Sequence, residues 1–148
     1  MEIPVYVTVD EVKRVCQLLK IRDWTALTAA KVEPGEAGIV LAELDTGDMP
    51  IELDDFIMGL EVELEHGLAD SAVNVTNNHP ILTGMIVLAH LKESLDYYKR
   101  LDVAEIEGDM LKAAAAGNEA KLMAKYRLLV KAKAALAAYE MEQLSGGK

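Results

Sequence analysis

The residues of this chain that could do chemistry are two short glutamate–histidine pairs. Glu63 and His66 form the first pair, and His90 and Glu93 form the second in reverse order. A separation of three residues places both side chains of a pair on one face of a helix. Imidazole nitrogen and carboxylate oxygen are ligands that zinc, iron and manganese accept in proteins. The two pairs therefore predict one transition-metal site, with iron or zinc as the candidate ion, in which all four residues are ligands.

The long stretch that leads up to the second pair has no basic side chain. Between Val32 and Leu91 there is no Lys or Arg, whereas the same stretch holds all three histidines and twelve Asp and Glu residues. A surplus of negative charge without neighbouring cations favours a bound cation. Glu61, Asp96 and Tyr97 lie close to the pairs in the sequence, and we expect them to hydrogen-bond the ligands and orient them.

A structural explanation of the same residues is also open. His66 falls at the expected C-terminus of its helix, where the helix dipole stabilises an imidazolium without any metal. Glu93 can hydrogen-bond His90 within one helix turn. A plain antiparallel hairpin would separate the two pairs by about 13 Å along the helix axis. The alternative prediction is a non-catalytic interaction or self-assembly protein in which these residues form a polar network that fixes the hairpin.

The sequence predicts that the secondary-structure elements around the two pairs are mainly helices. Residues 8–11 form a capping box that opens a helix to about residue 21, and residues 24–31 continue it or form a short second helix. Turns are predicted at residues 34–38 and 45–50, and residues 39–44 are ambiguous between helix and strand.

The two helices that carry the pairs are the clearest elements. Apolar residues recur with a 3.6-residue period from Leu53 to His66, and Gly67 directly after them predicts a left-handed helix stop. Pro80 suits the first turn of a helix that we expect to run over residues 80–101. The first half of that helix is apolar almost all round, so it is predicted to be the central one.

The C-terminal third is rich in alanine. Residues 109–116 and 118–144 are predicted helices broken at Gly117, the second with an apolar stripe formed by Leu122, Tyr126, Leu129, Val130 and Leu136. The fold class is therefore all-α, a bundle of four to six helices in a single domain over residues 1–148. From residue 112 to residue 133 there are six basic residues and one acid. If this helix with its basic flank is the functional surface, self-association into a homo-oligomer is expected.

The composition indicates which classes of partner and cofactor this protein is not expected to bind. A net charge of −10 over 148 residues repels phosphate backbones, so nucleic-acid binding is not expected. Residues 1–4 do not resemble a signal peptide, and no apolar run is long enough to span a bilayer, so no membrane association is expected. Cys16 is the single cysteine and lies in an apolar helical pattern, which predicts a buried thiol and a reducing, cytoplasmic location. There is no glycine-rich phosphate loop, so no nucleotide cofactor is expected, and no catalytic residue is identified.

Several strings together resemble a known family. They are FIMGLEVELEHG at 56–67, NVT at 74–76, LTG at 82–84 and LAHLKESLDYYKRL at 88–101. They are similar to a family of small bacterial, archaeal and phage proteins classed as a domain of unknown function. The resemblance implies a family-like core over residues 51–107 and an Ala-rich extension over residues 109–144, but no activity. It places seven polar residues in the family's strings: Glu63, Glu65, His66, His90, Glu93, Asp96 and Tyr97.

The chain departs from that family at two places. Met85 stands where the family usually has a lysine, and Ser94-Leu95 stands where Phe-Pro is usual. The loss of the lysine removes a cation from the neighbourhood of the acidic stretch.

Overall fold

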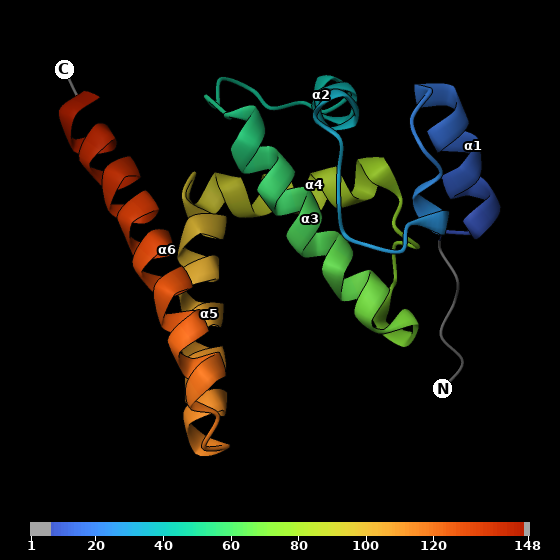
Figure 1. Ribbon diagram of the computed structural model, residues 1–148. Coiled ribbons are helices and arrows are strands. Elements are labelled where there is room, and N and C mark those ends of the chain that lie inside the picture. Colours follow the sequence, from blue (N-terminus) through green and yellow to red (C-terminus); the bar gives the residue numbers. More distant parts are fainter. Residues whose placement is uncertain (1–6, 147–148) are drawn as a thin grey trace. The chain divides into compact units, whose positions relative to one another are not determined.

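The computed structural model describes residues 7–146, which contain six α-helices, two short 3₁₀ turns and no strand (Figure 1). The all-α prediction is therefore confirmed. The chain forms two compact units, residues 1–95 and residues 96–148. The opening residues 1–4, from which a signal peptide was not expected, lie outside the described part. None of the helices in residues 7–146 combines the length and apolar character needed to cross a bilayer.

The N-terminal unit begins with helix α1, Val9–Leu19, which Thr8 caps as predicted, while the Glu11 side chain of the predicted capping box accepts from Arg14 at 2.7 Å. The Thr8 hydroxyl accepts a hydrogen bond from the Glu11 N–H at 3.2 Å. The 3₁₀ turn η1, Trp24–Ala26, follows, with Trp24 fully buried. Residues 24–31 therefore contribute a single short turn and then an extended segment, rather than a continuation of α1.

The turn predicted at residues 34–38 is wrong, because those residues begin helix α2, Pro34–Ala42. Proline at the first helical position costs no hydrogen bond. The Glu36 side chain accepts from the Glu33 N–H at 3.4 Å and closes a reciprocal cap. These local signals outweigh the two glycines at positions 35 and 38, and they settle residues 39–42 as helix.

Helix α3 is Leu53–Ala69 and continues through Gly67, so the predicted helix stop at that glycine is wrong. Gly67 serves a different purpose. A Cβ atom there would lie 2.5 Å from Asn78 Oδ1 and 2.8 Å from Asn74 Cγ. Asn74 donates to the Gly67 carbonyl at 3.3 Å and to Asn78 Oδ1 at 2.9 Å. The glycine therefore lets the loop after α3, including the 3₁₀ turn η2, Ser71–Val73, pack directly on the helix.

This close approach reverses the usual effect of a helical Gly→Ala change. We expect Gly67→Ala to lower the free energy of unfolding by about 1–3 kcal/mol, because the added methyl displaces the asparagine network. Gly38→Ala in α2 is the matched control, since a Cβ there meets nothing within 4 Å. It should raise stability by about 0.5–1 kcal/mol through helix propensity. Urea unfolding followed by circular dichroism measures both, and equal signs would contradict the packing role of Gly67.

Helix α4, Pro80–Glu93, contacts α1, α2 and α3 and is the central helix of the N-terminal unit. The helix predicted over residues 80–101 is two helices, because Ser94 takes an extended conformation (φ −158°, ψ 130°) and ends α4. No Gly or Pro marks this break in the sequence. Fully buried side chains from all four helices and η1 meet in the core, among them Val12, Trp24, Val40, Phe56, Leu60 and Val87.

Two buried atoms of this core, Trp24 Nε1 and the Thr83 hydroxyl oxygen, have no hydrogen-bond partner in the described residues. The Thr83 hydroxyl on α4 is buried, and the residue is 2% exposed. We expect Thr83→Val to leave stability unchanged or raise it by about 1 kcal/mol, because valine keeps the shape and removes the unsatisfied polar group. Thr83→Ala, which also removes packing, should lower stability instead. Thermal unfolding measures the pair; a marked loss for valine would mean that the hydroxyl has a bonded partner such as a buried water.

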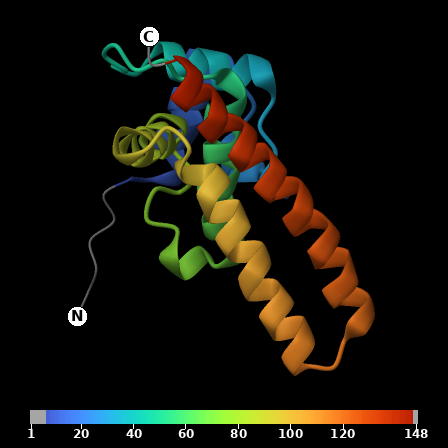
Figure 2. The ribbon, with the colours of Figure 1, turned by 90° about the vertical axis from the view of Figure 1, so that its left-hand side faces the viewer.

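The C-terminal unit is a helical hairpin of α5, Tyr97–Ala115, and α6, Glu119–Gly146 (Figure 2). Gly117, with φ +66°, forms the turn between them, as the sequence predicts. Ile106, Leu129 and Ala132 form its buried apolar cluster. Two cross-helix ion pairs of 2.7 Å, Lys125–Asp109 and Lys133–Glu107, flank this seam.

Candidate functional site

Helices α3 and α4 bring one member of each predicted pair together. Glu63 Oε1 lies 3.6 Å from His90 Nε2, with side chains 17% and 31% exposed. Both views show the two helices crossing steeply rather than running antiparallel (Figures 1 and 2). The 13 Å offset of a plain hairpin therefore does not apply to these two residues. Carboxylate and imidazole meet here as one half-buried polar pair between two helices.

The other two predicted ligands lie elsewhere on their helices. His66 is exposed in the last turn of α3, and Glu93 is exposed at the last residue of α4. Two crossing helices approach closely at one point only, so a residue one turn away from that point moves away from the partner helix. Across residues 7–146, no group of three or more His, Cys, Asp or Glu side chains is arranged to hold a metal ion.

The residues expected to orient the ligands have partners within their own units. Glu61 pairs with Lys31 at 2.6 Å and accepts from the Val32 N–H at 3.2 Å, so it ties α3 to the segment before α2. Asp96 pairs with Arg100 at 2.6 Å in the C-terminal unit. The Tyr97 ring packs edge-on against Tyr98, with 5.2 Å between ring centroids.

The remaining histidine and the cysteine have structural surroundings. His79 is 8% exposed, and its Nδ1 accepts from the Leu82 N–H at 3.3 Å, which caps α4. Burial lowers the pKa of His79 and so favours the neutral ring that this cap requires. Cys16 is buried on α1, and burial raises the pKa of its thiol, as expected for an inert core residue.

The surface that sequence reasoning missed lies on α6. The predicted stripe combined two faces of the helix, because Leu129 packs toward α5 whereas Tyr126 and Val130 are 51% and 53% exposed. A second stripe runs along the exposed face with spacings of three and four residues. It consists of Met123, Tyr126, Val130, Ala134, Ala137, Met141 and Leu144, every one of them exposed. This spacing could have been found in the sequence, but only the fold shows which of the two stripes is covered.

Comparison with known proteins gives a family and no activity. No curated protein and no solved structure matches the chain significantly. One family model matches residues 12–107, from α1 into α5. The match therefore includes the N-terminal helices in addition to the core over residues 51–107 that the sequence strings indicated, and α6 lies outside it. Because the match covers well over half of the 148 residues, the chain belongs to the family described as "Protein of unknown function (DUF5661)".

Proposed function

We propose that this protein is a helical interaction protein that assembles with a second copy of itself through α6. The observation that carries the proposal is the exposed stripe of seven apolar residues from Met123 to Leu144, which we name the α6 stripe. At about 100° per residue its members fall within an arc of roughly 80°, and it runs for about 32 Å. Apolar residues at spacings of three and four along one helix face are typical of helix–helix pairing.

The exposure of the α6 stripe is high for apolar side chains. Met141 is 62% exposed and Leu144 is 81% exposed, with Met123 at 53%. The side of α6 that packs on α5, with Leu129 and Ala132, lies roughly 120° around the helix. The helix therefore has two apolar faces, and α5 covers one of them. A long contiguous apolar surface that stays exposed favours a protein partner.

Charge and size complementarity favour a second, antiparallel copy as that partner. Basic residues occupy the first half of α6, and its acidic residues after Glu119 are Glu140 and Glu142. Antiparallel pairing sets each basic half against an acidic end, whereas parallel pairing sets like charges together. A pair centred between residues 133 and 134 matches large side chains with complementary ones across the two copies: Met123 with Leu144, Tyr126 with Met141 and Val130 with Ala137.

The same register supplies a charge pair on the flank. Arg127 and Glu142 lie on the same side of the α6 stripe. In an antiparallel pair, Arg127 of one copy would lie about two residues along the helix from Glu142 of the second copy. Neither has an ion pair or hydrogen bond among residues 7–146. We expect Arg127→Glu and Glu142→Arg each to weaken association, and the double variant to restore it.

Sedimentation velocity of the full chain tests the proposal directly. The expected result is a species of twice the 16.1 kDa chain mass, forming reversibly with concentration. A protein that stays monomeric up to about 200 μM would overturn the proposal, because weaker association has little specificity. The charge-swap series then tests the antiparallel register: failure of the double variant to recover association would reject that register.

Metal binding at Glu63 and His90 is the second candidate, favoured by their 3.6 Å approach across two helices. Iron or zinc would use these two residues first, and water or His66 and Glu93 after side-chain movement would complete the ligand set. The test is elemental analysis of protein purified without a histidine tag or chelator. A content below about a tenth of an equivalent, with no rise in melting temperature on adding Zn²⁺ or Fe²⁺, would reject this candidate. His90→Gln should abolish binding if it occurs.

Two further expectations accompany the proposal. The net charge of −10 makes a protein partner more suitable than a nucleic acid. The single buried Cys16 is consistent with a cytoplasmic protein, in which disulfides are not used.

A further inference from the structure

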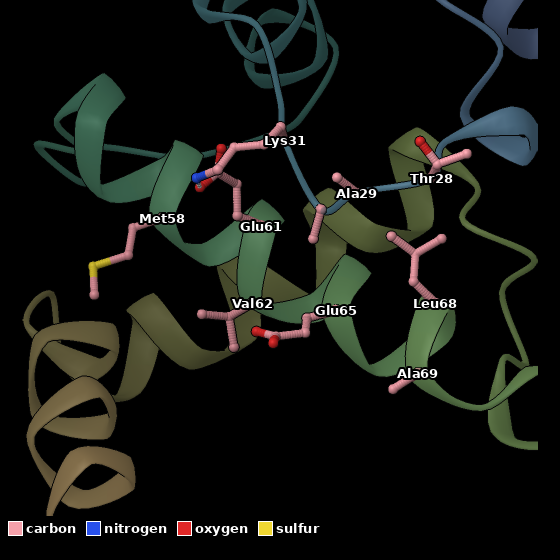
Figure 3. A pocket seen from close by; sticks show the side chains of 10 residues that line it. Thr28, Ala29, Lys31, Met58, Glu61, Val62, Glu65, Leu68 and Ala69 are labelled. Carbon is pink, nitrogen blue, oxygen red and sulfur yellow. Dashed lines mark hydrogen bonds and ion pairs between the residues drawn. The ribbon is translucent and has the colours of Figure 1, made fainter. Parts of the chain in front are cut away.

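A cavity of the N-terminal unit lies on one face of α3. It has a volume of about 560 Å³ and is formed by α3 and the extended segment between η1 and α2 (Figure 3). Such a volume is in the range of sites that take small organic molecules. Its lining consists of residues 28–31 and of side chains on one face of α3.

The walls of this cavity combine apolar surface with negative charge. Met58, Val62 and Leu68 supply the larger apolar side chains, with three alanines around them. Lys31 is the one cation in the lining, and Glu61 binds it at 2.6 Å. The Lys31–Glu61 pair is therefore neutral overall, and its ammonium is not offered to an anionic ligand.

The remaining negative charge in the lining of the cavity is that of Glu65. Its side chain makes no ion pair or hydrogen bond within residues 7–146, and Figure 3 shows it beside Val62 at the centre of the cavity wall. No Lys or Arg occurs between residues 33 and 90 to neutralise it from the same part of the sequence. An uncompensated carboxylate next to apolar side chains fits a ligand with a positive head and an apolar body.

We infer that this cavity binds a small organic cation, namely a primary alkylammonium with a short apolar chain. The ammonium would donate hydrogen bonds to the Glu65 carboxylate, and the alkyl chain would lie on Val62 and Leu68. Carboxylate–ammonium contacts are charge-assisted and stronger than neutral ones. Contact of the alkyl chain, five methylene groups and a methyl group in n-hexylamine, with this surface adds an apolar contribution. The inference is independent of α6 assembly, because every residue of the cavity belongs to the N-terminal unit.

Titration of the full chain with n-hexylamine hydrochloride at 0.15 M salt, followed by ¹H–¹⁵N NMR, tests the inference. We expect saturable shifts confined to residues 28–31 and 58–69, with a dissociation constant in the range of about 0.1 to a few mM for so small a ligand. Uncharged 1-hexanol should bind at least about tenfold more weakly, and hexanoate should not bind. If hexanol causes the same chemical-shift changes as hexylamine at the same concentrations, the proposed role of the ammonium charge is wrong.

Two variants separate a specific site from general attraction to an acidic protein. Glu65→Gln should weaken hexylamine binding about tenfold. Its fold should be retained, because the side chain is exposed and makes no hydrogen bond or ion pair within residues 7–146. Glu52→Gln removes another exposed carboxylate, before the first turn of the same helix, and should not change hexylamine binding. Equal losses in both variants, or shifts that do not saturate, would show non-specific attraction and overturn the inference.

Discussion

Replacement of Val130 by glutamate is expected to prevent formation of the proposed α6 dimer. Val130 lies at the middle of the α6 stripe and is 53% exposed in the single chain, so the change itself should not disturb the hairpin. In the proposed dimer it would bury an unpaired carboxylate from each copy. An uncompensated buried charge costs about 3–5 kcal/mol, which corresponds to a loss of at least about 100-fold in the association constant.

Leu128→Glu is the matched control for this experiment. Leu128 is 46% exposed on the same helix but lies roughly 160° around from Val130, away from the stripe. Sedimentation velocity should give the wild-type dimer constant for Leu128→Glu and a monomer for Val130→Glu. Circular dichroism should show unchanged helix content in both. If both variants remain dimers, α6 is not the assembly surface; if both become monomers, the effect is not specific to the stripe.

The second large effect is expected from Glu36, which connects α2 to the end of α1. Its carboxylate is 9% exposed and accepts hydrogen bonds from Arg22 Nη2 at 2.7 Å, Nε at 2.9 Å and the backbone N–H at 2.8 Å. Glu36→Ala leaves these donors and the Glu33 N–H without their acceptor. We expect a loss of about 3 kcal/mol in the free energy of unfolding. Glu43→Ala, at an exposed position after the same helix, should stay within about 0.5 kcal/mol of wild type.

The same carboxylate predicts a pH dependence. Burial alone would raise the pKa of Glu36, but the hydrogen bonds from Arg22 outweigh it and hold the pKa below the ordinary value of 4.5. A lowered pKa in the folded state contributes stability that is complete above the unfolded value. That stability is lost as the pH falls through the folded value.

The comparison with Glu36→Gln isolates this contribution. Glutamine keeps an acceptor oxygen and the shape of the side chain but does not titrate. The stability difference between wild type and Glu36→Gln should therefore be largest at about pH 6 and should shrink as the pH falls below 4.5. Urea unfolding at several pH values measures it, and a difference independent of pH would show that the charge of Glu36 does not stabilise the fold.

Local signals in the sequence were sufficient at several helix ends, although not at the start of α2. The cap at Thr8, the proline that opens α4 and the left-handed Gly117 act within a few residues of the chain, so the helix positions that depend on them were predicted. The same kind of signal was misread at Gly67. A glycine after a histidine resembles a helix stop, and only the loop folded back onto α3 explains why a side chain is excluded there.

The candidate site also depends partly on local sequence and partly on tertiary structure. The sequence pairs predicted that Glu63 and His90 belong to one site, and the fold places them 3.6 Å apart. His66 and Glu93, the other members of the two pairs, lie one turn further along each helix and are exposed. Spacing within one helix fixes which side chains share a face, but it carries no information on the angle at which a second helix crosses.

The sequence by itself determined that this protein is helical, acidic and a member of an uncharacterised family, because composition, periodicity and motif strings are properties of the chain alone. Tertiary structure decided which of two apolar stripes on α6 is covered, which glutamate meets which histidine, and where the cavity beside Glu65 lies. Each of these outcomes depends on packing between side chains that are far apart in the sequence. The angle at which two rigid helices meet sets the free energy of that packing, and the neighbouring residues in the sequence do not.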